Sequence, residues 1–369
     1  MFDLESKCDR QCEEFFRSVT TEGANTPSNT DELLSPQDIP WAKKELVQAS
    51  SKFYLNHAAS IFFANLSALV FGFSVKSDIA VLLRTGKFNT GEYALTRILS
   101  TGSRTLSWFQ GDLLDPASEG FKTSQRVRQM HSAASKIMNK PLPDNEEQFQ
   151  WTKEKEQFAQ AIRDDLDFVK TNEAPTDLFT YDPPVPLNQF DMMMTQFGFI
   201  FTVYRAPEAV GLQQNHPDIE AFLHTWAVVG RLLGLEDRYN LALRCTPELV
   251  DKLFVQVGLA CLKSMDHRSV SLQMECFKGL SNSCPIPLLF TLKGWFYVCM
   301  KNTIPGYEGK NLIKLMNFSD RVCIKMLQTF IFLLSASAIT RHIVNSMLGL
   351  WIGYGMVKRK FPLYLPKLW

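Results

Sequence analysis

The chain has 369 residues, of which 46% are hydrophobic and 21% are charged. This is the composition of a globular protein, and it excludes a disordered, collagen-like or fibrous chain. Thirty-nine basic residues are balanced by 38 acidic ones, so the net charge of +1 gives no long-range attraction to nucleic acid. We therefore expect a protein with an extensive core that does not bind nucleic acid.

The N-terminal segment, residues 1–35, is predominantly polar. Its second half, TTEGANTPSNTDELLSP (20–36), is rich in turn-forming residues, which predicts a tail or loop before a helical domain at 36–369. The first 16 residues are charged and lack the apolar stretch of a secretory signal peptide. We therefore predict an intracellular protein without a signal peptide.

Helical spacing of apolar residues recurs along most of the remaining chain. Strand-like alternation is scarce and no repeat of fixed period occurs, so we predict an all-α fold built as a single large domain. The predicted helices lie at residues 41–57, 58–75, 90–108, 120–138, 189–204, 217–235, 247–264 and 270–279.

Residues 140–186 differ in composition from the rest of the chain, because they are strongly charged and are bounded by the proline-containing segments KPLPD and YDPPVP. Within them, Phe158, Ile162, Leu166 and Val169 follow helical spacing and form one apolar stripe. This pattern predicts a charged helical insertion rather than a separate domain.

Two segments raise the question of a membrane. Residues 58–75 carry no charge over 18 positions, but Asn65 and three serines interrupt them, which favours a buried central helix over a membrane span. Residues 326–360 are apolar apart from one Arg-His pair and a terminal basic cluster, a pattern also typical of an interfacial anchor. For these C-terminal helices, core packing and membrane association both remain open.

The common hydrolase and nucleotide-binding motifs are missing from the sequence, which contains no HExxH, GxSxG, GxxxxGK[ST] or GxGxxG. No two histidines share a helical turn, which disfavours a zinc site. A single histidine in an apolar helical pocket suits axial ligation of haem iron, because the porphyrin supplies four ligands and the protein needs to supply only one.

His131 is the candidate for that ligand. Two arginines one helical turn away, Arg126 and Arg128, would pair with the haem propionates. The alternative is a helix with a solvated basic side and one histidine whose hydrogen bonds are satisfied. His224 is the rival ligand, although its neighbours predict a packing histidine at the end of a helix.

A second polar stripe precedes this helix. Arg97, Thr101, Arg104 and Trp108 fall at i, i+4, i+7 and i+11, so they share one face of a helix. An arginine and a hydroxyl inside an apolar chain need polar partners, which a bound ligand or bound oxygen would provide. A partly exposed helix with Trp108 packed beneath it is the alternative.

Four segments in order resemble the rubber oxygenases, also called latex-clearing proteins, and the endoplasmic-reticulum-bound oxygenases of mycophenolic acid biosynthesis. They are TRILST (96–101), RVRQMH (126–131), TQFGF (195–199) and HTWAVVGRLLGLEDRYN (224–240). The resemblance covers about residues 45–245.

The resemblance implies a haem b held in a globin-like helical core with extra helices. It implies that His131 is the axial iron ligand, because His131 follows Arg97 by the family's spacing of 34 residues. It also implies that Arg97 and Thr101 are the catalytic pocket residues. The full set of implied cofactor-binding residues is His131, Arg126, Arg128 and Thr195.

Two departures from the family leave the substrate open, because Ser100 replaces a lysine of the family and Val81 lies near the place of its pocket glutamate. The favoured hypothesis is a haem b-dependent oxygenase, an oxidoreductase that uses dioxygen on a small, apolar, isoprenoid-like substrate. A non-catalytic haem-binding sensor and a cofactor-free helical protein on a membrane surface are the alternatives. If the C-terminal helices contact lipid, the endoplasmic reticulum membrane is the expected place of attachment.

Overall fold

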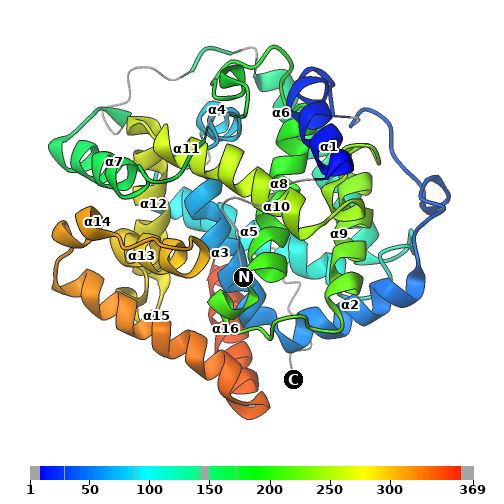
Figure 1. The fold of residues 1–369 in the computed structure, drawn as a ribbon. Coiled ribbons are helices and arrows are strands. Elements are labelled where there is room, and N and C mark those ends of the chain that lie inside the picture. The colour runs from blue at the N-terminus through cyan, green and yellow to red at the C-terminus, as the bar shows by residue number, and fades with distance from the viewer. Residues whose placement is uncertain are drawn as a thin grey trace.

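The computed structural model describes residues 9–28, 30–86, 88–138, 140–142, 149–171 and 173–358, and Figure 1 shows their path. Within these ranges the regular structure is helical, and the strand-type pairing is limited to one isolated bridge between Pro27 and Asn188. The prediction of an all-α fold in a single domain is therefore confirmed.

The predicted helices correspond to helices of the structure, with boundaries that differ by a few residues. The first half of the chain forms α1 (Arg10–Thr21), α2 (Lys44–Asn56), α3 (Ala58–Gly72), α4 (Lys76–Thr85), α5 (Gly91–Phe109), α6 (Glu119–Ile137) and α7 (Lys153–Asp165). The second half forms α8 (Gln189–Arg205), α9 (Ile219–Leu233), α10 (Pro247–Leu253), a π-helical turn (Phe254–Leu259), α11 (Ala260–Lys263), α12 (His267–Ser283), α13 (Leu292–Thr303), α14 (Lys310–Lys314), α15 (Phe318–Ala336) and α16 (Ala338–Lys358).

The uncharged segment 58–75 supplies α3, the central helix of the core. Its side chains are buried nearly all round, and it packs against α8, α13 and α16. A helix that is apolar on every side is stable in water only when other elements cover it. The prediction of a buried central helix is therefore confirmed.

Among the described residues, no individual helix is both long enough and apolar enough to be a candidate membrane span. The pair α2 and α3 meets both criteria only when taken together, and the two helices are bent by 88° at the break between them.

The N-terminal segment contains a helix where we predicted a polar tail. Asp9 caps α1 by accepting a hydrogen bond of 2.8 Å from the Cys12 amide, and Phe15, Phe16 and Val19 are buried in the common core. The prediction is therefore wrong for residues 10–21. The apolar residues of α1 recur at i, i+3, i+4 and i+7, but they stand among enough charges to hide the stripe.

The charged insertion contributes α7, which packs against α11, α12 and α14. All four residues of its predicted stripe are buried and belong to the common core. Residues 143–148, at the start of the insertion, lie outside the described part of the chain. The charges of α7 therefore form its solvated side, as expected for an amphipathic helix on a shared core.

The first residue of α5 lies in close backbone contact with α12. Gly91 at the start of α5 lies so near Gly279 of α12 that a Cβ atom built on Gly279 would be 2.0 Å from the Gly91 carbonyl oxygen. No real side chain fits at that distance, so the two backbones touch only because both residues are glycines.

We expect the substitution Gly279→Ala to lower the free energy of unfolding by about 3 kcal/mol, because α5 and α12 must separate to admit the methyl group. Chemical denaturation followed by circular dichroism would measure the change. Gly72→Ala is the matched control, since a Cβ atom at Gly72 meets nothing within 4 Å. Equal effects at the two positions would contradict the close crossing.

Candidate functional site

The candidate site lies between α5 and α6, which pack against each other. Thr90 caps α5 by accepting from the Tyr93 amide at 3.3 Å, and Ser118 caps α6 by accepting from the Phe121 amide at 3.1 Å. A Cβ atom at Gly120 would lie 2.6 Å from the Ser107 carbonyl oxygen, so the start of α6 touches the end of α5. This local geometry holds the two predicted polar faces against one another.

The imidazole of His131 lies in a low-dielectric environment beside positive charge. Burial lowers its pKa from 6.5 to about 4, and the positive charges of Arg97, Arg104 and Arg128 act in the same direction. Two of these arginines come from α5 and one from α6 itself. The structure therefore brings Arg97 and His131 together, and the imidazole is neutral at pH 7.

One nitrogen of this imidazole has no partner. The Nδ1 atom of His131 is buried and makes no hydrogen bond to the described residues. A backbone hydrogen bond with Leu233, in the last turn of α9, acts on the same ring and raises its pKa slightly against the larger effects. A neutral imidazole with an unpartnered nitrogen is the form in which histidine ligates a metal.

Other polar groups of α5 also have no partner. Arg97 is half-buried and makes no hydrogen bond or ion pair to the described residues, and burial together with the charge of Arg104 lowers its pKa. The Ser103 hydroxyl and the Trp108 indole nitrogen are likewise unsatisfied, while Thr101 is half-buried. Unpaired buried polar groups are costly, so a polar ligand bound beside α5 would stabilise these atoms.

The two arginines predicted to pair with haem propionates have other partners. The side chain of Arg128 is fully buried and donates to the carbonyl oxygens of Glu32, Arg231 and Leu232. Arg126 is exposed and pairs with Glu119 at 2.7 Å. Arg128 thus satisfies carbonyl groups in the last turn of α9. The spacing in RVRQMH did not predict this contact, because spacing cannot tell which element covers a helical face.

The last predicted cofactor-binding residue, Thr195, lies on the exposed side of α8. Its hydroxyl donates to the Asp191 carbonyl of the preceding turn at 3.0 Å. In this structure it is turned toward solvent, away from the buried polar groups of α5 and α6.

The two downstream motifs instead brace α8 against α9. The amide of Gln196 donates to the Trp226 carbonyl and to the Asn240 side chain, both at 2.9 Å. Asn240 in turn donates to the Ala227 carbonyl at 2.8 Å. A Cβ atom on Gly230 would lie 2.6 Å from the Gln196 amide nitrogen, so this glycine makes room for the brace.

His224, the rival ligand, occupies a different place. Its Nε2 atom accepts a hydrogen bond of 2.8 Å from the Lys43 amide, and its ring meets Trp41 edge to face. It lines a groove of about 540 Å³ together with Lys43, Cys245 and residues at the start of α1 and α10. The Nε2 atom is already used by the backbone, so His224 is a packing histidine, as its neighbours predicted.

Comparison with known proteins gives one local similarity. The chain is 36% identical over 55 residues to the rubber oxygenase of Streptomyces sp. (strain K30). The match covers 15% of this chain and 14% of that protein, so most of both sequences lies outside it. No family model matches the chain, and no solved structure matches it.

We expect Arg128→Met to lower the free energy of unfolding by at least about 2 kcal/mol, because it leaves three buried carbonyl groups without their donor. Arg126→Gln is the matched control on the same helix, and its exposed ion pair contributes no more than about 0.5 kcal/mol. Urea denaturation of the two variants would measure the difference. A stable Arg128→Met variant would contradict the structural role of this side chain.

His131 should also make the free energy of unfolding decrease as the pH is lowered. In the unfolded chain its pKa is 6.5, whereas in the folded chain it is about 4, so protons bind preferentially to the unfolded state as the pH falls between these values. The stability lost from pH 7 to pH 5 should be about 2 kcal/mol smaller in His131→Leu than in the wild type.

Urea denaturation at the two pH values would measure this difference, with the substitution of an exposed histidine, His342→Gln, as the control. An identical loss of stability in the wild type and in His131→Leu would show that the imidazole is not held neutral by its surroundings.

Proposed function

We propose that this protein is a haem b-dependent oxygenase in which His131 is the axial ligand of the iron. The observation that carries the proposal is the neutral imidazole of His131, whose buried Nδ1 atom has no partner among the described residues. The local similarity to a rubber oxygenase supports the same chemistry. The globin-like arrangement of the surrounding helices is part of this proposal.

The residues present fit such a group. Haem iron needs only one ligand from the protein, and a bound haem would activate dioxygen. His131 would hold the iron, and the backbone at Leu233 would fix the orientation of the imidazole ring. This second contact matters because a ligand that rotates freely loses affinity for the metal.

Arg97 and Arg104 would provide the positive side of the pocket. Both guanidinium groups act electrostatically on His131, and Arg97 is half-buried and has no hydrogen bond or ion pair among the described residues. A buried cation is stabilised by an anionic neighbour, and haem propionates or a negatively polarised oxygen both qualify. We therefore assign Arg97 and Thr101 to hydrogen bonding with the oxygen substrate, the role that the family resemblance implies.

The substrate would be small and apolar, with an isoprenoid-like alkene as the first candidate. Phe62 lies over the same helix, because its ring is 3.9 Å from the position of a Cβ atom on Gly102, next to Thr101. Of the buried phenylalanines of α3, Phe62 is therefore the one that faces α5, whereas Phe63 stacks on Trp295 and Phe71 packs against Phe254. An aromatic ring at this position would exclude water from the site and favour an apolar substrate by burial of its surface.

A second candidate function is haem binding without turnover, as in a gas or redox sensor. Three cavities of the described residues, including the groove at His224, contain neither His131 nor Arg97 nor Thr101 in their lining. A histidine site without a separate substrate cavity beside it would suit a sensor.

Absorption spectroscopy of the purified protein supplied with haem tests the proposal. The wild type should give a Soret band, and His131→Ala should bind haem at least about tenfold more weakly or with a shifted band. His224→Ala is the matched control and should leave the band unchanged, because His224 is used by the backbone. A band that is identical in the wild type and in His131→Ala would remove His131 as the ligand.

An assay of product formation distinguishes an oxygenase from a haem-binding sensor. With an isoprenoid alkene and dioxygen, Arg97→Leu should lose about 100-fold in rate while it retains haem, because one hydrogen-bond donor to the reacting oxygen is removed. Haem binding by the wild type without any product from such alkenes would favour the sensor.

A further inference from the structure

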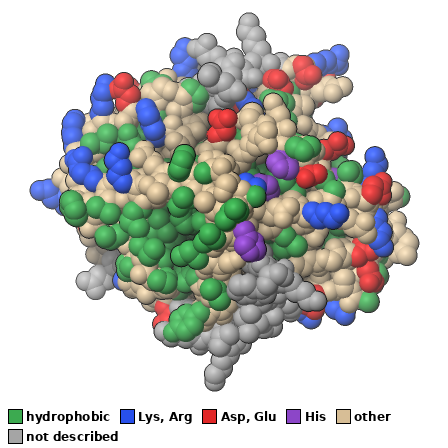
Figure 2. Space-filling model, turned by 90° about the horizontal axis from the view of Figure 1, so that it is seen from below, with side chains coloured by type: hydrophobic (Ala, Val, Ile, Leu, Met, Phe, Trp, Pro, Cys, Tyr) green, Lys and Arg blue, Asp and Glu red, His purple; other side chains and the backbone are tan. Residues whose placement is uncertain are grey.

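The C-terminal helix α16 exposes an apolar face. Ile339, Met347, Leu350 and Tyr354 are 74%, 57%, 61% and 68% exposed, and Ile343 lies on the same side at helical spacing. Figure 2 shows hydrophobic side chains gathered into one patch on the side of the molecule where α15 and α16 lie. Exposed large apolar residues that are contiguous mark a binding surface more often than isolated ones do.

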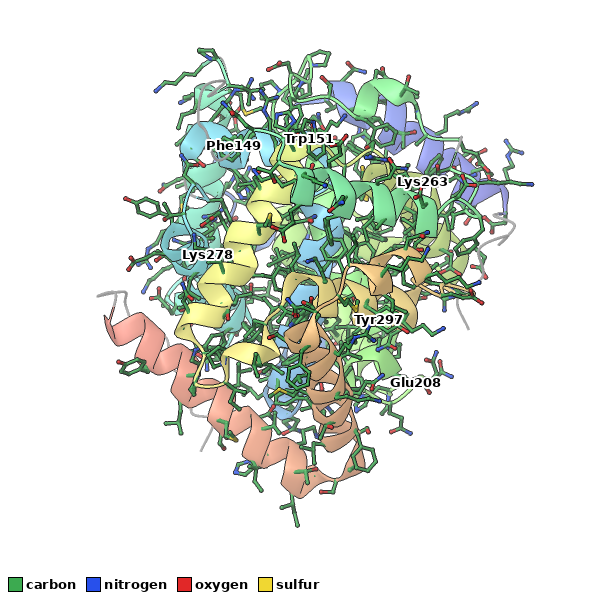
Figure 3. All side chains as sticks on the ribbon, turned by 90° about the vertical axis from the view of Figure 1, so that its left-hand side faces the viewer. Phe149, Trp151, Glu208, Lys263, Lys278 and Tyr297 are labelled. Atoms are coloured by element: carbon green, nitrogen blue, oxygen red, sulfur yellow. The ribbon has the colours of Figure 1, made fainter. Side chains whose placement is uncertain are left out.

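The opposite face of α16 is fixed to the body of the protein. Asn345 accepts a hydrogen bond of 2.9 Å from the Ala59 amide, and it donates to the Asn56 carbonyl at 3.0 Å. The Trp351 indole donates to the Ser283 carbonyl at 3.0 Å. The exposed residues therefore cannot turn inward, and α16 is held with its apolar side directed outward. Figure 3 shows α16 along the lower left margin of the molecule.

The exposed charges of the two C-terminal helices are of one sign. From 342 to 357 the sequence of α16 contains no Asp, Glu, Lys or Arg. Arg321 and Lys325 of α15 are exposed, whereas Asp320, the single acidic residue of the two helices, is buried as part of a helix cap. An apolar helix face on a helix pair with exposed cations complements the surface of a membrane that contains anionic lipids.

We propose that α15 and α16 form a docking surface for anionic lipid bilayers, with α16 lying in the plane of the interface. The apolar side chains from Ile339 to Tyr354 enter the boundary between headgroups and acyl chains, while Arg321 and Lys325 contact phosphate and carboxylate groups of the lipids. In this arrangement α16 lies on the bilayer surface and does not cross it.

This surface is adjacent to the candidate site. The α16 helix packs against α3 and α5, and Trp351 lies edge to face with Phe62 at 6.0 Å between ring centroids. An apolar substrate dissolved in the bilayer would therefore be held close to the helix that carries Arg97 and Thr101. The docking itself does not depend on the oxygenase proposal, because it rests on α15 and α16 alone.

Co-sedimentation with lipid vesicles tests the proposal. The full-length protein should bind vesicles of phosphatidylcholine and phosphatidylserine, and should bind phosphatidylcholine vesicles much less. The double variant Met347→Asp with Leu350→Asp should bind at least about tenfold more weakly, because two apolar side chains can no longer be buried. Arg321→Gln and Lys325→Gln should each cost about fivefold, and added salt should weaken wild-type binding.

Leu33→Asp is the matched control, since Leu33 is an exposed leucine outside both C-terminal helices and its substitution should leave binding unchanged. Failure of the wild type to bind anionic vesicles would overturn the proposal, as would equal binding by the Met347/Leu350 variant. A concentration-dependent dimer that this variant dissociates, without vesicle binding by the wild type, would assign the face to a second copy of the chain instead.

Discussion

The arrangement around His131 depends on one buried guanidinium group. Arg128 has no exposed surface, and it joins three segments by donating to carbonyl groups at Glu32 and at the last turn of α9. The last turn of a helix leaves carbonyls without partners, and a cation there also meets the negative end of the helix dipole. Arg128 therefore fixes α6 against the end of α9, at the place where the Leu233 backbone reaches the His131 ring.

The site that results has positive charge and little to balance it. The pKa values of His131 and Arg97 are both lowered, which means that each group is less stable in its charged form than it would be in water. A protein accepts such a cost where a ligand or a reaction offsets it. An anionic group bound between α5 and α6 would be stabilised by the arginines, and the positive charge of the arginines disfavours protonation of His131.

The sequence predicted the helices well because most of them bury one face, and burial imposes a period of 3.6 residues. It missed α1, whose stripe is short and diluted by charges, and it could not show what Arg128 contacts. The step from Arg97 to His131 along the chain was clear, but only the packing of α5 on α6 brings the two residues together. Gln196 and Asn240 belong to two separate motifs, and their mutual hydrogen bond became visible only in three dimensions.

The C-terminal helices show what the periodicity of apolar residues cannot predict. A helix that is apolar on two opposite sides has no pronounced stripe, so sequence alone cannot separate a core helix from one at a membrane surface. In the folded chain α16 has both characters: Asn345 and Trp351 anchor one side to the core, and residues such as Met347 and Leu350 occupy the exposed side. Water solvates that side poorly, so the uncharged exposed face carries a free-energy cost for the isolated protein that contact with a lipid interface would relieve.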